Sequence, residues 1–307
     1  MQPQLPRRRF FQDAALMTAA AAGGLASLGT TAPARAIEPI ERSYGPMFKF
    51  SLAAYSYREL LTGNPPKLTL FDFLNDCAAM QLEGTEPTSY YFPEGFGAEY
   101  LCKLKAHAFK LGLDISGTAI RNDFCLPPGP KRDEEMAHAR QWIDHATLLG
   151  APVIRVFSGK QAKGQSLEEA HRLCVEGMEE ACAYAGTKGV FLALENHGGL
   201  TATAEGLLKL VRDVQSPWFG VNYDSGNFHQ DPYAELEQIA PYALNVQIKV
   251  VVSDEGKQNK RPSDFKRLAQ MLRAVGYRGY IVLEFEEKED PREACPKYIA
   301  RIREAFA

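Results

Sequence analysis

The stretch Phe191-Leu-Ala-Leu-Glu195-Asn-His-Gly-Gly199 decides the fold of this chain. Its apolar run predicts a buried strand, and a carboxylate stands where that run ends and the glycines begin. A carboxylate buried at that point loses hydration energy unless a cation meets it. The pattern recurs, with an oxygen-bearing side chain at the end of each apolar run, in Phe219-Gly-Val-Asn-Tyr-Asp224, Ala243-Leu-Asn-Val-Gln247 and Tyr280-Ile-Val-Leu-Glu284.

These runs are the last four of eight strand-like segments that alternate with helix-like segments after residue 36. The predicted strands cover residues 48–55, 82–86, 113–120, 152–157, 191–195, 219–224, 243–249 and 280–284. The predicted helices cover residues 70–80, 98–111, 133–149, 167–188, 204–214, 233–239, 264–274 and 292–305. Eight strand–helix units in a length close to ~250 residues favour a closed parallel (β/α)8 TIM barrel over an open sheet. The prediction is an α/β chain with a single barrel domain over residues 37–307.

The N-terminal segment carries the features of an export signal. Arg7-Arg8-Arg9-Phe10-Phe11 precedes an Ala-rich apolar run over residues 14–28, and Ala34-Arg35-Ala36 forms a cleavage signal. This order predicts a twin-arginine signal peptide over residues 1–36, cleaved after Ala36. The apolar run is shorter than the ~20 residues of a membrane-spanning helix, so no stable span is expected. We expect the mature protein outside the cytoplasm, most simply in a bacterial periplasm.

Charge and cysteine usage exclude two classes of function. The formal net charge of −3 becomes −6 once the four arginines and one aspartate of residues 1–36 are removed. An acidic chain disfavours a nucleic-acid partner. The 6 cysteines are scattered without a C-x-x-C pair, which argues against a metal–thiolate site and leaves any disulfide pairing undecided.

In a parallel barrel the carboxyl ends of all strands open on one face, which brings the four strand-end side chains together. These side chains are Glu195, Asp224, Gln247 and Glu284. Three carboxylates and one amide oxygen suit Mn²⁺ or Mg²⁺, with Fe²⁺ and Co²⁺ as alternatives. Side-chain alternation places Asn222 on the face of Asp224, and Lys249 on the face of Gln247. The sequence therefore predicts a divalent-metal site at this end of the barrel.

Several motifs at the strand ends belong together. They read Glu195-Asn-His-Gly-Gly, Asp224-Ser-Gly-Asn, Gln247-Ile-Lys249 and Gly276-Tyr-Arg-Gly-Tyr-Ile-Val-Leu-Glu284, with Pro152-Val-Ile-Arg155-Val-Phe-Ser-Gly159 and Gly84-Thr-Glu86 before them. They resemble the xylose isomerase-like TIM-barrel superfamily, the sugar isomerase and epimerase group, over nearly the whole mature chain. The resemblance implies a Glu, Asp, His, Glu metal set, from which Gln247 departs because an amide replaces the imidazole. A histidine often found three residues after the Asp is Asn227 here, which leaves open whether His229 takes its place.

The chemistry that the resemblance implies is proton transfer at a carbon next to a carbonyl. A metal chelates the substrate oxygens and stabilises an enediolate, while Glu195 and Glu284 serve as ligands and as the acid–base pair. Arg155, His197 and Lys249 are candidate donors to the substrate. Each has a structural alternative: Arg155 neutralises nearby carboxylates, His197 anchors a neighbouring residue, and Lys249 pairs with Glu284 or Glu286.

Further substrate-binding candidates lie in the loops. Glu86 is predicted to be a pocket residue, and His229 is a candidate substrate ligand. Tyr90-Tyr91-Phe92 follows the second strand and has two interpretations: a pocket wall that stacks on a sugar ring, or packing of the loop itself.

Three functions remain open from the sequence. The first is a metal-dependent isomerase or epimerase of a free sugar or keto-sugar. The second is a lyase or dehydratase acting on an oxidised glycoside or inositol derivative, and the third is a non-catalytic carbohydrate-binding barrel, supported by Gln247. The resemblance also implies a homo-oligomer. The expected partner is a small carbohydrate rather than a nucleic acid, and export argues against a phosphorylated one.

Overall fold

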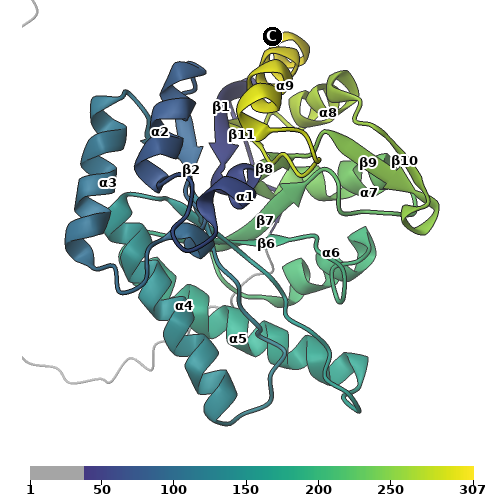
Figure 1. The fold of residues 1–307 in the computed structure, drawn as a ribbon. Helices are drawn as coiled ribbons and strands as arrows, with labels where there is room; N and C mark the ends of the chain where they lie inside the picture. Colours follow the sequence, from purple (N-terminus) through teal and green to yellow (C-terminus); the bar gives the residue numbers. More distant parts are fainter. Residues whose placement is uncertain (1–37) are drawn as a thin grey trace, which may run out of the picture. The chain divides into compact units, whose positions relative to one another are not determined.

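A nearly closed parallel sheet forms the centre of the part of the chain that this computed structural model describes, residues 38–307 (Figure 1). The predicted signal peptide lies outside the described residues. The 9 strands follow the order β3-β2-β1-β11-β8-β7-β6-β5-β4. Their bounds are β1 Met47–Ala53, β2 Gly84–Glu86, β3 Asp114–Ile115, β4 Thr118–Ala119, β5 Val153–Val156, β6 Phe191–Glu195, β7 Phe219–Asp224, β8 Ala243–Ile248 and β11 Arg278–Leu283. All pairs in this sheet are parallel, which confirms the predicted barrel.

The predicted third strand is split, and the split lets the sheet close on itself. β3 pairs with β2, whereas β4 pairs with β5, and the chain changes neighbours at Gly117. A Cβ atom at Gly117 would lie 3.1 Å from the Val153 side chain, so glycine suits this close passage. The two ends of the sheet are therefore consecutive pieces of one strand.

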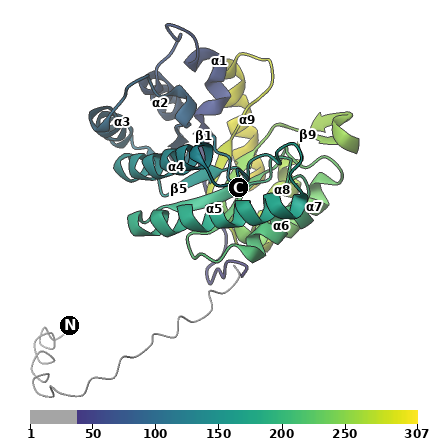
Figure 2. The same ribbon diagram turned by 90° about the horizontal axis from the view of Figure 1, so that it is seen from below.

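Helices surround the sheet (Figures 1 and 2). Their bounds are α1 Arg58–Leu61, α2 Leu70–Ala79, α3 Ala98–Lys110, α4 Pro130–Leu149, α5 Leu167–Lys188, α6 Ala204–Asp213, α7 Pro232–Ile239, α8 Phe265–Ala274 and α9 Pro291–Phe306. Short 3-10 turns lie at Ala54–Tyr57, Ser89–Tyr91, Ala240–Tyr242 and Glu255–Lys257. The eight predicted helices are all present, and only the single turn α1 was not predicted.

Local chemistry explains where helices begin and end. Thr69 and Asp72 form a reciprocal capping box at the start of α2. Gly150 and Gly189 end α4 and α5 with φ of 83° and 70°, in the left-handed region that glycine adopts without strain. α4 starts at Pro130, earlier than predicted, because proline fits the first helical turn.

The interior of the barrel is unusually polar. Along β8, Asn245 and Gln247 alternate with Val246 and Ile248, and all four are buried. Strand alternation sends the apolar pair toward the helices and the amides into the barrel, where branched apolar residues are the common filling. The barrel interior is thus built to hold a polar site.

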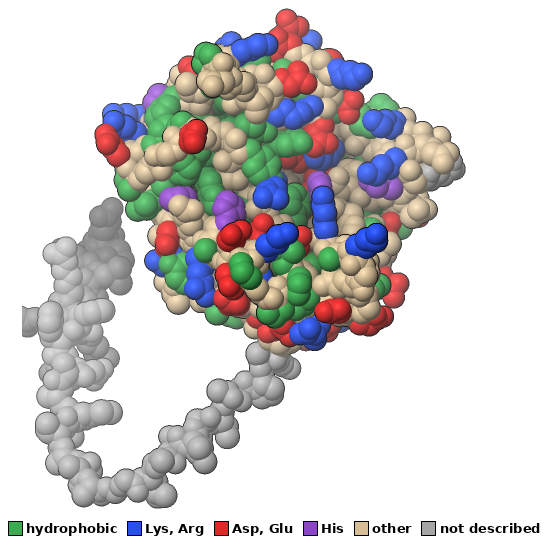
Figure 3. All heavy atoms as spheres, turned by 60° about the horizontal axis from the view of Figure 1, so that its bottom comes forward, with side chains coloured by type: hydrophobic (Ala, Val, Ile, Leu, Met, Phe, Trp, Pro, Cys, Tyr) green, Lys and Arg blue, Asp and Glu red, His purple; other side chains and the backbone are tan. Residues whose placement is uncertain are grey.

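Two strands outside the barrel were not predicted. β9 Val251–Asp254 and β10 Asn259–Pro262 form an antiparallel hairpin directly after β8. Across residues 38–307 no helix is long and apolar enough to cross a membrane. All 6 cysteines lie in this range as free thiols, 5 of them buried. On the face shown in Figure 3, acidic and basic side chains are interspersed.

Candidate active site

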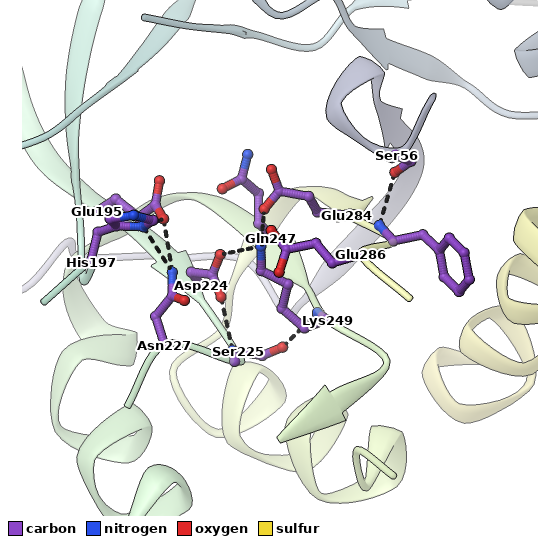
Figure 4. A network of polar contacts seen from close by, with 12 residues as sticks. Ser56, Glu195, His197, Asp224, Ser225, Asn227, Gln247, Lys249, Glu284 and Glu286 are labelled. Atoms are coloured by element: carbon purple, nitrogen blue, oxygen red, sulfur yellow. Dashed lines mark hydrogen bonds and ion pairs between the residues drawn. The ribbon is translucent and has the colours of Figure 1, made fainter. Parts of the chain in front are cut away.

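A cavity of about 460 Å³ opens at the carboxyl ends of the barrel strands, where TIM-barrel enzymes place their active sites. Five of the predicted site residues line it: Arg155, Glu195, His197, Lys249 and Glu284. Four others do not: Glu86, Asp224, His229 and Gln247. The two carboxylates predicted to remove and return the substrate proton therefore line one cavity. Figure 4 shows the polar contacts around Glu195 and those around Lys249 and Glu284.

Glu195, the last residue of β6, is buried among polar partners. Its Oε2 lies 2.8 Å from Arg155 Nε, and its Oε1 lies 2.7 Å from His197 Nδ1. Asn227 also donates a hydrogen bond of 2.8 Å to Oε1. Burial acts to raise the pKa of Glu195, but the charge of Arg155 and the contact with His197 outweigh it and lower the pKa. Glu195 is therefore ionised near neutral pH.

Arg155 is held firmly in this position. It is 4 % exposed, its Nη1 donates to the Ile120 carbonyl at 2.8 Å, and its guanidinium lies 4.1 Å from the centre of the Phe157 ring. This confirms the structural alternative that Arg155 neutralises a carboxylate. Because the residue also lines the cavity, the same guanidinium faces the space for a ligand.

Lys249 is the centre of the second cluster. Its Nζ lies 2.5 Å from Glu284 Oε2, 2.8 Å from Glu286 Oε1 and 3.3 Å from Asp224 Oδ2. Burial acts to lower the pKa of Lys249, but these carboxylates outweigh it and raise the pKa well above its usual value. Lys249 is a fixed ammonium, and its predicted pairing with Glu284 or Glu286 is confirmed for both.

Asp224, at the end of β7, is positioned by the residue that follows Glu195. Asn196 Oδ1 accepts from the Asp224 backbone N–H, and Asn196 Nδ2 donates to the Asp224 carbonyl, both at 2.9 Å. Oδ1 of Asp224 accepts from the Gly226 backbone N–H at 2.8 Å. Oδ2 is buried without a hydrogen bond and lies 3.3 Å from Lys249 Nζ. Burial raises the pKa of Asp224 well above its usual value, and the charge of Lys249 opposes that rise.

Below the cavity, Gln247 belongs to a closed ring of buried side chains. Its Oε1 accepts from Asn222 Nδ2 at 2.7 Å, and its Nε2 donates to Glu86 Oε1 at 2.6 Å. Asn245 Nδ2 completes the ring by donating to Glu86 Oε2 at 2.8 Å and to Asn222 Oδ1 at 2.9 Å. Burial, and then the charge of Glu284, raise the pKa of Glu86 to about 7.

Glu86 and His229 lie elsewhere than expected. Glu86 was expected in the pocket, but it is 0 % exposed and fills the barrel interior beneath the cavity. His229 Nδ1 lies 3.0 Å from Ser253 Oγ, next to the hairpin of β9 and β10 and away from the cavity lining. Asn227, rather than His229, reaches Glu195.

The predicted metal ligands already have other partners in this structure. Within residues 38–307, no group of three or more His, Cys, Asp or Glu side chains is arranged to hold a metal ion. The Lys249 ammonium lies between Asp224 and Glu284, and the Gln247 oxygen already accepts a hydrogen bond. As arranged here these residues do not fit a divalent cation, and the metal set stays a prediction.

Of the three aromatic residues after β2, one lines the cavity and the other two pack the loop. Tyr90 is 40 % exposed and lines the cavity, where Tyr55 lies 6.5 Å away, centre to centre. Tyr91 is buried, and Phe92 packs on Trp142 at 5.2 Å. One ring of the three is therefore available to a ligand.

Several residues that line the cavity were not predicted from the sequence. They follow β4, β5 and β11: Arg121, Asn122, Asp123, Phe157, Ser158, Gly159, Lys160 and Glu286. Their shared signal is position, since each stands within a few residues of a strand's carboxyl end. Glu286 was predicted as a partner of Lys249 but not as a lining residue, although alternation places it on the face of Glu284, two residues earlier.

Comparisons with known proteins agree with the fold. The family model described as Xylose isomerase-like TIM barrel matches residues 74–305. D-psicose 3-epimerase from Clostridium cellulolyticum H10 is similar in structure, with a TM-score of 0.70, 14% identity, and coverage of 84% of this chain and 99% of that chain.

L-ribulose 3-epimerase is similar in structure, with a TM-score of 0.69, 16% identity, and coverage of 85% of this chain and 95% of that chain. The IOLI protein with a bound zinc atom has a TM-score of 0.66 and 17% identity, with coverage of 84% of this chain and 96% of that chain. A comparison with curated proteins finds no match. Since the family model covers most of the barrel, the chain belongs to the xylose isomerase-like TIM barrel family.

Proposed function

We propose that the protein is a sugar isomerase or epimerase that moves a proton next to a carbonyl, through an enediolate, on a free sugar or keto-sugar. The observation that carries the proposal is the cavity in which Glu195 and Glu284 stand together with the cations Arg155 and Lys249. Membership of the family and the two 3-epimerases among the similar structures support it. At 14% and 16% identity those structures establish the fold alone.

The residues divide the work by charge. Glu195 is held ionised by Arg155, so it is the group that removes the proton from carbon. Glu284, the residue after β11, is the second carboxyl group facing the cavity. It takes a proton from solvent and gives it to the neighbouring carbon or to the other face, while Glu195 releases its proton to solvent. Arg155 and Lys249 place positive charge where the oxygen of the enediolate develops its negative charge.

His197 and Tyr90 position the substrate. His197 is 55 % exposed in its side chain while its Nδ1 contacts Glu195, so its outer edge is open to a substrate hydroxyl. Tyr90 offers an exposed ring at the mouth, and aromatic faces suit the apolar side of a sugar. The cavity of about 460 Å³ is in the size range of sites for small ligands.

The test is NMR detection of solvent deuterium in a panel of free ketoses, aldoses and 3-keto-glycosides. We expect incorporation at the carbon next to the carbonyl, reduced at least ~100-fold in Glu195→Gln and in Glu284→Gln. Glu99→Gln, which removes an exposed carboxylate that does not line the cavity, is the matched control and should exchange normally.

The products decide between the proposal and its alternatives. An isomer or epimer of the substrate supports it. Release of an eliminated fragment would show a lyase, and a sugar that binds without exchange would show a binding barrel; either result would overturn the proposal.

A further inference from the structure

We propose that the ammonium of Lys249 takes the place and the electrostatic role of a divalent ion, so that this site works without a metal. The catalytic part of this inference rests on the proposed function, whereas the metal-binding part stands without it. The zinc in the IOLI protein belongs to that protein. In this chain the contacts of the four predicted metal ligands favour a site without a metal.

The first argument is the position of the Lys249 charge. Three carboxylates from β7 and the segment after β11 converge on its Nζ: Glu284 at 2.5 Å, Glu286 at 2.8 Å and Asp224 at 3.3 Å. These distances leave no room for a second cation between the same oxygens. A dication placed beside a buried ammonium would also be repelled strongly, because the low local dielectric does not screen like charges.

The second argument is that the backbone and the side-chain stem of Lys249 are both held in place. Its backbone N–H donates to Ser225 Oγ at 2.8 Å, and its carbonyl accepts from Ser263 Oγ at 2.7 Å. Its stem runs against Gly226, where an added Cβ would lie 2.5 Å from Lys249 Cγ. Because Gly226 of the Asp224-Ser-Gly motif has no side chain, it leaves the space that the Lys249 stem occupies.

The third argument concerns the other two predicted ligands. Gln247 uses its oxygen to accept from Asn222 and its nitrogen to donate to Glu86, so its amide serves the buried ring. Turning the oxygen to a metal would leave Asn222 Nδ2 unpaired at a position that is 0 % exposed. Glu195 already has a counter-charge, because Arg155 Nε lies 2.8 Å from its Oε2, so a metal ion there would meet a second buried cation.

The arrangement still leaves the ammonium available to a substrate. Glu286 is the most exposed of its three partners, at 43% of its side chain against 0% for Asp224 and 6% for Glu284. A substrate carbonyl oxygen that enters the cavity replaces Glu286 on Nζ, while Asp224 and Glu284 keep the ammonium in place. Lys249 then carries the positive charge that stabilises the enediolate oxygen.

The test is a Mn²⁺ titration followed by electron paramagnetic resonance, in which free Mn²⁺ gives the signal and bound Mn²⁺ does not. After dialysis against EDTA, we expect the wild type to leave the free signal unchanged and to exchange substrate protons as fast with EDTA as without it. Lys249→Met should expose Asp224, Glu284 and Glu286 together, acquire one Mn²⁺ site per chain, and lose exchange in EDTA. Lys209→Met, an exposed lysine on α6, is the control and should behave like the wild type.

Tight binding of one Mn²⁺ per wild-type chain, or loss of wild-type exchange in EDTA with recovery on adding Mn²⁺, would overturn the inference. Both measurements use the wild-type protein, so they test the inference even if Lys249→Met fails to fold. The Mn²⁺ titration needs no substrate. If no sugar in the panel exchanges, the proposed function is rejected, and the Mn²⁺ titration still tests whether Lys249 occupies the metal position.

Discussion

At the scale of the residue, each carboxylate of the site is matched by a fixed cation or a ring of amides. Glu195 faces Arg155, and Glu284 faces Lys249. Glu86 has no ion pair and accepts from two amides instead. Burial of a charge is costly unless such partners exist, so the removal of one partner should show directly in the titration of the other.

Arg155→Met tests the first of these pairs. Without the guanidinium, burial should dominate and the pKa of Glu195 should rise. We expect the acid limb of the kcat/KM against pH profile to move to higher pH, and the free energy of unfolding to fall by about 3–5 kcal/mol. Urea unfolding and a pH–rate series measure both. An unshifted acid limb would show that Arg155 does not control the proton on Glu195.

Glu86→Gln tests the buried ring. The folded-state pKa of about 7 exceeds the ordinary value of 4.5, so the folded state holds the proton more tightly than the unfolded chain. The stability from this group is complete below pH 4.5 and is lost as pH rises toward 7, by up to about 3 kcal/mol. We expect the free energy of unfolding to depend less on pH across this window in Glu86→Gln. Equal slopes in the two proteins would contradict the raised pKa.

At the scale of the element, the strands and helices were largely predictable because their apolar periods are long and their ends carry caps. The split of the third strand was not, since it depends on which neighbour each half meets in the closed sheet. The hairpin of β9 and β10 was also missed. Its strands are only 4 residues long, and β10 is exposed along its whole length, so β10 shows no apolar pattern and the two valines of β9 are too few to predict a separate strand.

Gly226→Ala tests whether the turn after β7 must leave space for the side chain of Lys249, the residue after β8. The new methyl would lie 2.5 Å from Lys249 Cγ and should push the lysine stem out of its path. We expect a loss of about 1–3 kcal/mol in the free energy of unfolding and a large fall in deuterium exchange. Gly97→Ala, where no atom lies within 4 Å of the added Cβ, is the control. Normal exchange in Gly226→Ala would show that the ammonium tolerates displacement.

At the scale of the whole molecule, the location of the site was predictable and its internal pairing was not. Strand ends in a parallel barrel converge, so Glu195 and Glu284 could be placed in one cavity from the sequence. The sequence could not tell that Lys249 would lie between Asp224 and Glu284. It also could not tell that Gln247 would turn to Glu86, because both depend on side-chain rotamers across different strands.

Export belongs to the same scale and stays a prediction from the N-terminal sequence. Replacing Arg7, Arg8 and Arg9 together by Lys keeps the charge and removes the twin-arginine signal. In a host with the twin-arginine pathway, we expect the variant to stay uncleaved in the cytoplasm, while the wild type reaches the periplasm with Ile37 as its first residue. Cell fractionation with N-terminal sequencing measures this. Equal export of both proteins would reject the assignment.

The most direct test of the account is the rate of solvent deuterium incorporation into one active sugar in the presence of EDTA. Wild type and Glu195→Gln are compared side by side. The account predicts exchange next to the carbonyl in the wild type, undiminished by the chelator, and at least ~100-fold slower exchange in the variant. Equal exchange in both proteins, or exchange in the wild type only after Mn²⁺ is added, would contradict it.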